Sequence, residues 1–261
     1  MSTGAILALG GGGARGLAHL GVLQVLREQG IHPAGIVGTS MGAVMAALYG
    51  AGIDLDRMED LAEVFPWQDM LDIQFHRGLG LIGVDRMQAV LALLTKGKTF
   101  AQLSLPVWVV ATDLETGAPV ILRDGPVAQA VAASAAVPGV FAPVGLGGRL
   151  LVDGGVVAGV PVEIALEMGR PVVAVDVGSD FPAVKPRNIL GVLAQVVRIM
   201  GSNLDRRQVA RADLVIRPEV GGLGTARFDQ ARQCVAWGRE AAVAALPALR
   251  SLLQKERRTW A

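Results

Sequence analysis

The chain has 261 residues, of which 52% are hydrophobic and 18% are charged, and its formal net charge is +1. This length suits one large α/β domain over residues 1–261, and the hydrophobic content argues against disorder. A charge so close to zero, without a basic stripe, argues against nucleic acid as a partner.

The chain has one cysteine, Cys234, so it cannot form an internal disulfide. Its first residues lack the charged region and the cleavage pattern of a secretory signal. Two long uncharged stretches, 29–53 and 125–148, are interrupted by glycine and proline, which would leave backbone groups unpaired in lipid. We therefore expect a cytoplasmic protein without a transmembrane helix, with at most a peripheral membrane contact.

The N-terminal part predicts two strand, loop and helix units in succession. Residues 5–9 form a short apolar run, glycines follow at 10–13, and a helical pattern covers 15–29. A second apolar run at 35–39 leads directly into a helical pattern at 41–49. This order is typical of α/β proteins.

The middle of the chain is less regular. Helical patterns at 55–63 and 84–95 flank an apolar stretch around 64–82. For this stretch a surface segment packed on the sheet is favoured over a mobile lid. Its candidates for a membrane contact are Phe65, Trp67 and Phe75.

The rest of the chain continues the alternation of strands and helices. The predicted elements are strands at 107–111 and 119–122, a helix at 126–134, strands at 141–144, 149–152 and 171–177, helices at 188–201 and 203–210, a strand at 213–216, and a C-terminal helical region in which Pro247 starts a new turn. Together they predict an α/β fold with a mostly parallel central sheet.

Residues 38–42 read Gly-Thr-Ser-Met-Gly and fit the pattern G-x-S-x-G. In this pattern glycines flank a serine on a sharp turn between a strand and a helix. An ordinary turn with Ser40 as the helix N-cap is the alternative. The apolar run before Ser40 and the helix-forming residues after it favour the nucleophile reading.

A serine nucleophile needs a base, and histidine is the usual one. In an α/β-hydrolase the histidine comes last in the chain, yet the histidines here are His19, His32 and His76. His19 and His32 precede Ser40, and His76 lies in a loop; all three are more often structural or solvated residues. A carboxylate must therefore be considered as the base.

Asp153 ends a predicted strand and is followed by two glycines, which let another backbone approach closely. An aspartate that only caps its own Asp-Gly turn is the alternative. Asp113 and Asp176 also end predicted strands, but no glycine pair follows either of them. Only hydrogen-bond reach to Ser40 can decide among the three.

The loop 10–16, Gly-Gly-Gly-Gly-Ala-Arg-Gly, lies between the first strand and the first helix. Its amides could bind a nucleotide phosphate, but the chain has no P-loop lysine and the dinucleotide pattern is loose in a run of glycines. An oxyanion hole needs the same fixed backbone donors. A phosphate- or nucleotide-binding module therefore remains the alternative to an enzyme.

In this order, segments 11–16, 38–42 and 153–155 resemble the signatures of the patatin-like phospholipases, as do 133–141 and 111–114. The resemblance implies a three-layer α/β/α fold and hydrolysis of acyl esters of the phospholipid or lysophospholipid type. One departure is visible: relatives often have Asn-Asn-x-Pro after the Asp-Gly-Gly, where this chain has Ala158-Gly159-Val160-Pro161.

Residue by residue, the resemblance implies Ser40 as the nucleophile and Asp153 as the base. It assigns Gly11, Gly12 and Gly13 to the oxyanion loop, and the Met41 N–H is a further expected donor. No cofactor and no metal ion enters this mechanism, and the partner is a lipid or a small ester. An acyltransferase that uses the same acyl-enzyme is the alternative among enzymes.

Overall fold

The computed structural model describes residues 4–64, 82–178, 186, 189–225 and 227–259. Residues 65–81 are not among them, so the predictions for a lid around 64–82, for His76 and for a membrane contact through Phe65, Trp67 and Phe75 concern residues outside the described ones.

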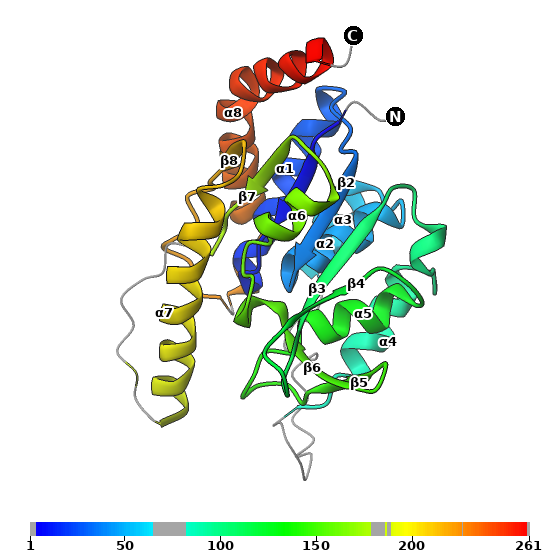
Figure 1. Ribbon diagram of the computed structural model, residues 1–261, viewed down its shortest axis with the longest axis vertical. Helices are drawn as coiled ribbons and strands as arrows, with labels where there is room; N and C mark the ends of the chain where they lie inside the picture. Colours follow the sequence, from blue (N-terminus) through cyan, green and yellow to red (C-terminus); the bar gives the residue numbers. More distant parts are fainter. Residues whose placement is uncertain (1–3, 65–81, 179–185, 187–188, 226, 260–261) are drawn as a thin grey trace.

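The described residues form an eight-stranded mixed sheet with helices on both faces (Figure 1). In chain order the strands are β1 Ile6–Leu9, β2 Gly35–Thr39, β3 Val107–Asp113, β4 Pro119–Leu122, β5 Val144–Leu146, β6 Arg149–Asp153, β7 Val172–Val175 and β8 Leu214–Ile216. They follow the order β5-β6-β3-β2-β1-β7-β8, with β4 paired to β3. The neighbouring strands β3, β2, β1, β7 and β8 pair in parallel. The pairings of β4 and β6 with β3, and of β5 with β6, are antiparallel.

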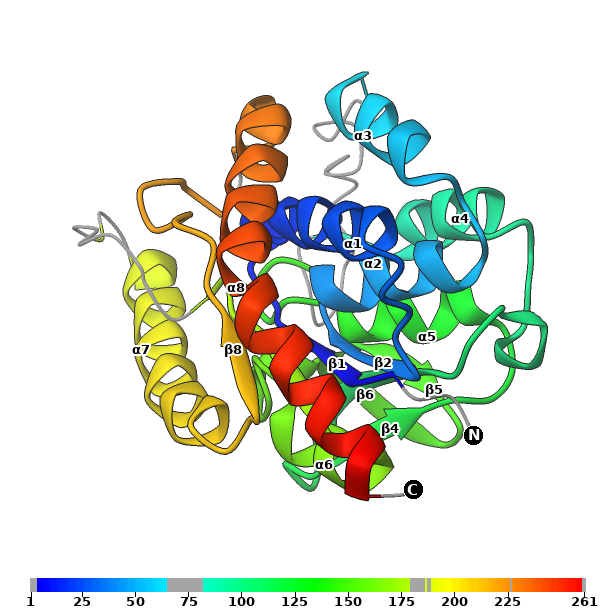
Figure 2. The same ribbon diagram turned by 90° about the horizontal axis from the view of Figure 1, so that it is seen from above.

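The helices are α1 Ala18–Glu28, α2 Met41–Gly50, α3 Leu55–Val64, α4 Asp85–Leu94, α5 Val127–Ser134, α6 Val162–Met168, α7 Ile189–Val209 and α8 Ala231–Thr259. Figure 2 shows α1, α2, α4 and α5 above the sheet and α6 below it, with α7 at the side beyond β8. The expected three-layer α/β/α arrangement is confirmed.

Strand β1 shows how the sequence builds these layers. Leu7 and Leu9 pack in the core beneath α1 and α2, while Ile6 and Ala8 pack in the second core against α6. Alternate residues of a strand point to opposite faces, so a strand buried on both faces must be apolar throughout. The continuous apolar run of β1 is therefore required by its central position.

Three predicted boundaries differ from the structure. The helices predicted at 188–201 and 203–210 form one helix, α7, in which Gly201 lies close to the Gly155 carbonyl oxygen. Helix α8 continues through Pro247, which a helix accepts when tertiary packing outweighs the lost hydrogen bond. The strand predicted at 141–144 begins at Val144, and Phe141 forms only an isolated bridge with Ile82.

Among the described residues no helix combines the length and the apolar character that a membrane crossing requires.

Candidate active site

Ser40 lies on the turn between β2 and α2 in a strained backbone conformation. Its φ is 54° and its ψ is −121°, a region that non-glycine residues rarely occupy. The turn is crowded: a Cβ atom on Gly42 would overlap the Leu9 carbonyl oxygen, and one on Gly38 would overlap the Gly42 carbonyl oxygen. Both glycines of the motif are thus required by close backbone contacts, and the serine is held out at the end of the strand.

The sheet register brings Asp153 level with Ser40. Thr39, the last residue of β2, pairs with Val110, and the next residue of β3, Ala111, pairs with Asp153 of β6. Across β3, the Ser40 Oγ donates a hydrogen bond of 2.7 Å to Asp153 Oδ2. Two residues that are 113 positions apart therefore form one polar pair.

Further hydrogen bonds hold Asp153 in place. The other carboxylate oxygen, Oδ1, accepts a 2.7 Å hydrogen bond from the Gly155 N–H, and the main-chain oxygen of Asp153 accepts one from the Thr112 hydroxyl. The residue is only 6% exposed, and this burial raises the pKa of its carboxyl to about 6, although the hydrogen bonds from Ser40 and Gly155 act in the opposite direction. At neutral pH the carboxylate is still the major form, and it is a stronger base than a solvated aspartate.

The two competing aspartates make other contacts. Asp113 accepts hydrogen bonds from the N–H groups of Glu115 and Thr116 and so closes its own turn. Asp176 accepts from the Gly178 N–H and from Arg217 Nε. Of the three candidates, Asp153 is the one that the Ser40 hydroxyl reaches.

The glycine loop lies beside Ser40, and its amides divide into two groups. A Cβ on Gly11 would lie 3.2 Å from Ser40 Cβ. The Gly11 N–H donates to the Gly159 carbonyl oxygen at 2.8 Å, so it is not available to a ligand. Within the described part of the chain the amides of Gly12, Gly13 and Met41 have no acceptor. Of the four amides expected to donate to a substrate oxygen, these three can still do so.

Contacts with His19 and with a distant segment of the chain fix the two ends of this loop. The Gly10 carbonyl oxygen lies 2.7 Å from His19 Nε2, and the Ala14 N–H donates to the Thr225 carbonyl oxygen at 2.8 Å. The buried Arg15 side chain donates through Nε to the Leu223 carbonyl oxygen at 2.7 Å. The loop is therefore held by backbone carbonyls of a segment more than 200 residues later.

His19 is fully buried, and burial lowers its pKa to about 4. The ring is neutral at physiological pH, and it contacts the loop through the Gly10 carbonyl and not the Ser40 hydroxyl. Of the structural or solvated roles predicted for His19, the structural one applies.

Sequence reasoning gave no role to Ser134, the last residue of α5. Its hydroxyl donates to the Val110 carbonyl oxygen at 2.6 Å and accepts from the Ser40 N–H at 2.9 Å. The strained turn at Ser40 thus gains an acceptor for an otherwise unpaired amide. The only signal in the sequence is that Ser134 lies in the segment 133–141 that resembles the family.

An apolar cavity of about 250 Å³ opens at Ser40. Gly13, Ser40 and Met41 form its polar end, and the rest of its wall comes mainly from α2, α3 and α4. Prominent apolar residues of the wall are Met45, Leu48, Met58, Met87, Leu91 and Phe141. The cavity can hold a flexible hydrocarbon chain whose polar end lies at the serine.

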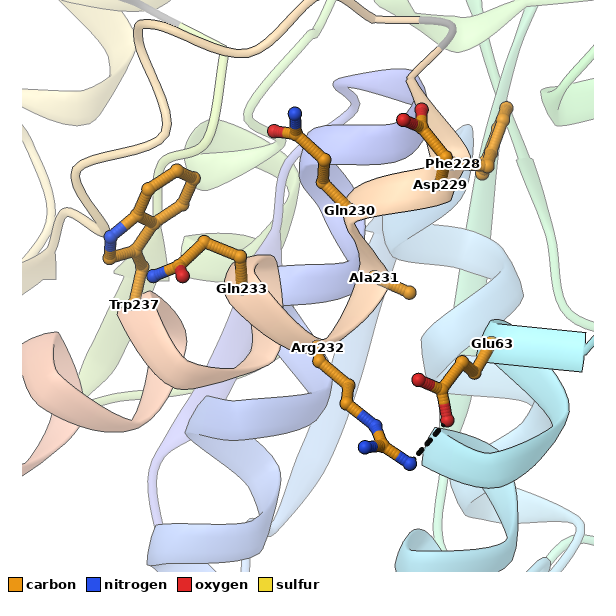
Figure 3. A pocket seen from close by; sticks show the side chains of 8 residues that line it. All are labelled: Glu63, Phe228, Asp229, Gln230, Ala231, Arg232, Gln233 and Trp237. Atoms are coloured by element: carbon orange, nitrogen blue, oxygen red, sulfur yellow. Dashed lines mark ion pairs between the residues drawn. The ribbon is translucent and has the colours of Figure 1, made fainter.

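Figure 3 shows a second hollow, of about 530 Å³, where the N-terminal end of α8 faces the end of α3. Its wall carries the ion pair between Arg232 and Glu63 together with Asp229 and Gln230. Neither Ser40 nor Asp153 contributes to it. Across the described ranges, no group of three or more His, Cys, Asp or Glu is placed to hold a metal ion.

Comparison with known proteins places the chain in a family. Residues 7–166 match the family described as patatin-like phospholipase. An uncharacterised NTE family protein of Mycobacterium tuberculosis is 40% identical over 158 residues, which cover 59% of this chain and 43% of the relative. A second such protein of the same organism is 30% identical over 275 residues, covering 95% of this chain and 47% of the relative. The chain thus spans less than half of the length of each.

Among solved structures, VipD from Legionella pneumophila has a similar fold, with a TM-score of 0.67 at 16% identity, over 96% of this chain and 67% of that one. The family match covers more than half of the chain, and it includes the glycine loop, the serine turn and the Asp-Gly-Gly segment. The chain belongs to the patatin-like phospholipase family.

Proposed function

We propose that the protein is a lipid acyl hydrolase of the phospholipase or lysophospholipase type that works through a Ser40–Asp153 dyad. The observation that carries the proposal is the 2.7 Å hydrogen bond from the Ser40 hydroxyl to the buried Asp153 carboxylate, at the polar end of an apolar cavity. This arrangement supports roles for Ser40 as nucleophile, for Asp153 as base and for the cavity as the site of an acyl chain. Membership of the family supports the lipid ester as the substrate class.

In the first step the Ser40 Oγ attacks the ester carbonyl carbon, and its proton passes to Asp153. The electrons of the carbonyl double bond move to its oxygen, which the amides of Gly12, Gly13 and Met41 then stabilise. The positive end of the α2 dipole also lies at Ser40 and favours this negative charge. When the carbonyl re-forms, the alcohol leaves with the proton from Asp153, and the acyl group stays on Ser40.

In the second step water attacks the acyl-enzyme, and Asp153 accepts its proton. The bond between the acyl carbon and Ser40 Oγ then breaks, Asp153 returns the proton to Oγ, and the fatty acid is released. The raised pKa of the Asp153 carboxyl, about 6, supports this role because a base is most effective when its pKa lies near the working pH. The acyl chain would occupy the apolar cavity throughout, since its wall is built from aliphatic and aromatic side chains.

The test compares the purified wild type with Ser40→Ala and Asp153→Asn on a p-nitrophenyl ester and on lysophospholipids and diacyl phospholipids. We expect both variants to lose turnover while they keep the wild-type circular dichroism spectrum. Ser104→Ala is the matched control, because Ser104 lies before the opposite, N-terminal end of β3 and its hydroxyl donates to the Gly50 carbonyl oxygen at 3.0 Å. Undiminished turnover in either dyad variant would rule out the dyad.

Two further readouts bear on the mechanism. A fluorophosphonate should label Ser40 and leave Ser40→Ala unlabelled, and labelling of another residue would contradict the assignment. Product analysis in the presence of added alcohol separates hydrolysis from acyl transfer: free fatty acid is the expected product, and an ester of the added alcohol as main product would identify an acyltransferase instead.

A further inference from the structure

Residues 157–160, which follow the Asp-Gly-Gly segment, are attached to three other parts of the chain. The Ala158 carbonyl oxygen accepts from the Thr39 hydroxyl at 2.8 Å, next to the nucleophile. The Gly159 carbonyl oxygen accepts from the Gly11 N–H at 2.8 Å, in the oxyanion loop. We call residues 157–160 the strap, because they connect the nucleophile strand, the oxyanion loop and α7.

Helix α7 holds the strap from its other side through a buried carboxylate. Asp205 Oδ1 accepts from the Val160 N–H at 3.1 Å, and the carboxylate also accepts from the Gly159 N–H. A Cβ on Gly159 would overlap this carboxylate, so glycine is required at the position where Asp205 enters. Asp205 is only 7% exposed, and burial raises the pKa of its carboxyl to about 6.

These contacts form one short path from α7 to the proposed oxyanion hole. The carboxylate fixes the peptide group between Gly159 and Val160, and the carbonyl oxygen of Gly159 fixes the amide of Gly11. The next two amides, those of Gly12 and Gly13, are the proposed donors to the substrate oxygen. Displacing a catalytic group by about 1 Å can cost a hundredfold in rate, so the direction of Gly11 matters.

We propose that Asp205 is a positioning residue of the active site, whose carboxylate holds the strap and thereby aims the oxyanion loop at the substrate. The inference rests on the proposed function. It differs from a role in folding stability because it predicts a loss of transition-state stabilisation in each correctly folded molecule.

The test uses Asp205→Asn and Asp205→Ala. Asparagine keeps the shape but replaces one of the two carboxylate oxygens by an NH2 group, which cannot accept from a strap amide, and alanine removes both acceptor oxygens. Activity on p-nitrophenyl butyrate is divided by the number of active sites found by fluorophosphonate titration. We expect kcat per active site to fall by about tenfold in the asparagine variant and about a hundredfold in the alanine variant, with KM changed by less than about threefold.

The second readout is binding of a trifluoromethyl ketone, which adds to Ser40 and places a negative oxygen in the oxyanion hole. Its affinity should fall by the same factor as kcat/KM in each variant. Asp213→Asn is the matched control, because Asp213 also accepts a hydrogen bond from a backbone N–H, that of Val172, but at the opposite end of the sheet. It should leave both quantities unchanged.

The outcomes separate the two proposals. A wild type without esterase activity or fluorophosphonate labelling refutes the proposed function itself. An active wild type whose Asp205 variants keep kcat and ketone affinity per active site refutes the positioning role, even where their melting temperature falls. If Asp205→Ala does not fold, the asparagine variant decides alone.

Discussion

Replacing Asp153 by asparagine should make the protein more stable near pH 8 while it removes the proposed base. In the native structure the Asp153 carboxylate is buried, and its pKa is raised from 3.8 to about 6. The unfolded chain solvates the same carboxylate freely. Ionisation therefore costs the folded state more than the unfolded state, and the neutral asparagine avoids this cost.

The size of this change in stability follows from the pKa shift of Asp153. A difference of about two pKa units corresponds to about 3 kcal/mol in the free energy of unfolding. The pKa of Asp153 is higher in the folded state than in the unfolded state. The wild type therefore has this contribution to the free energy of unfolding in full below about pH 4 and loses it as the pH rises through about 6. Asparagine can keep both contacts, since its oxygen can accept from Gly155 and its amide can donate to the Ser40 hydroxyl.

The assay is the melting temperature of wild type and Asp153→Asn, followed by circular dichroism from about pH 4 to pH 8. At this chain length about 3 kcal/mol corresponds to about 6 °C, so the variant should melt about 6 °C higher near pH 8 and equally near pH 4. Asp124→Asn is the control, because this side chain is 95% exposed, and its curve should follow that of the wild type. A variant that melts at or below the wild-type temperature near pH 8 would refute the reasoning.

Three further outcomes are expected. Gly42→Ala should lower the free energy of unfolding, followed by thermal melting, by about 3 kcal/mol or more, because the added Cβ would overlap the Leu9 carbonyl oxygen. Gly145→Ala is the control and should melt like the wild type, because no atom lies within 4 Å of the added Cβ. Met45→Trp should fill part of the cavity at Ser40. The factor by which it lowers kcat/KM should be about ten times larger for a long-chain p-nitrophenyl ester than for p-nitrophenyl butyrate. An equal loss of kcat/KM for both esters would contradict the placement of the acyl chain in the cavity. The Cys234 thiol, whose pKa burial raises to about 11, should react with a disulfide reagent near pH 8 far more slowly in the native protein than in guanidinium, and equal rates would show that it is accessible.

The elements around the serine could be predicted from the sequence because their signals are local. Strands β1 and β2 are short apolar runs bounded by glycine, and the observed bounds lie within one residue of the predicted ones. The extent of α7 and of α8 could not be predicted in the same way. Gly201 and Pro247 are helix-ending signals in isolation, and tertiary packing overrides them here.

The pairing of Ser40 with Asp153 could be suggested from motifs and from the missing late histidine, but only the register of the strands across β3 brings the two side chains into contact. Ser134 and Asp205 carried no signal of their own. Each is a common polar residue in a helical pattern, and its importance comes from the backbone group that it meets in space. Such contacts join segments far apart in the chain, so spacing along the sequence does not reveal them.

The glycine loop 10–16 is anchored to residues 221–225 through main-chain carbonyl oxygens, those of Gly221, Leu223 and Thr225. A carbonyl group is the same in every amino acid, so this anchorage constrains the path of the segment and hardly constrains its side chains. The side chains of residues 221–225 can therefore differ between relatives while the segment continues to hold the loop. The match to the family model ends at residue 166, whereas the segment that holds the glycine loop lies more than 50 residues beyond that point.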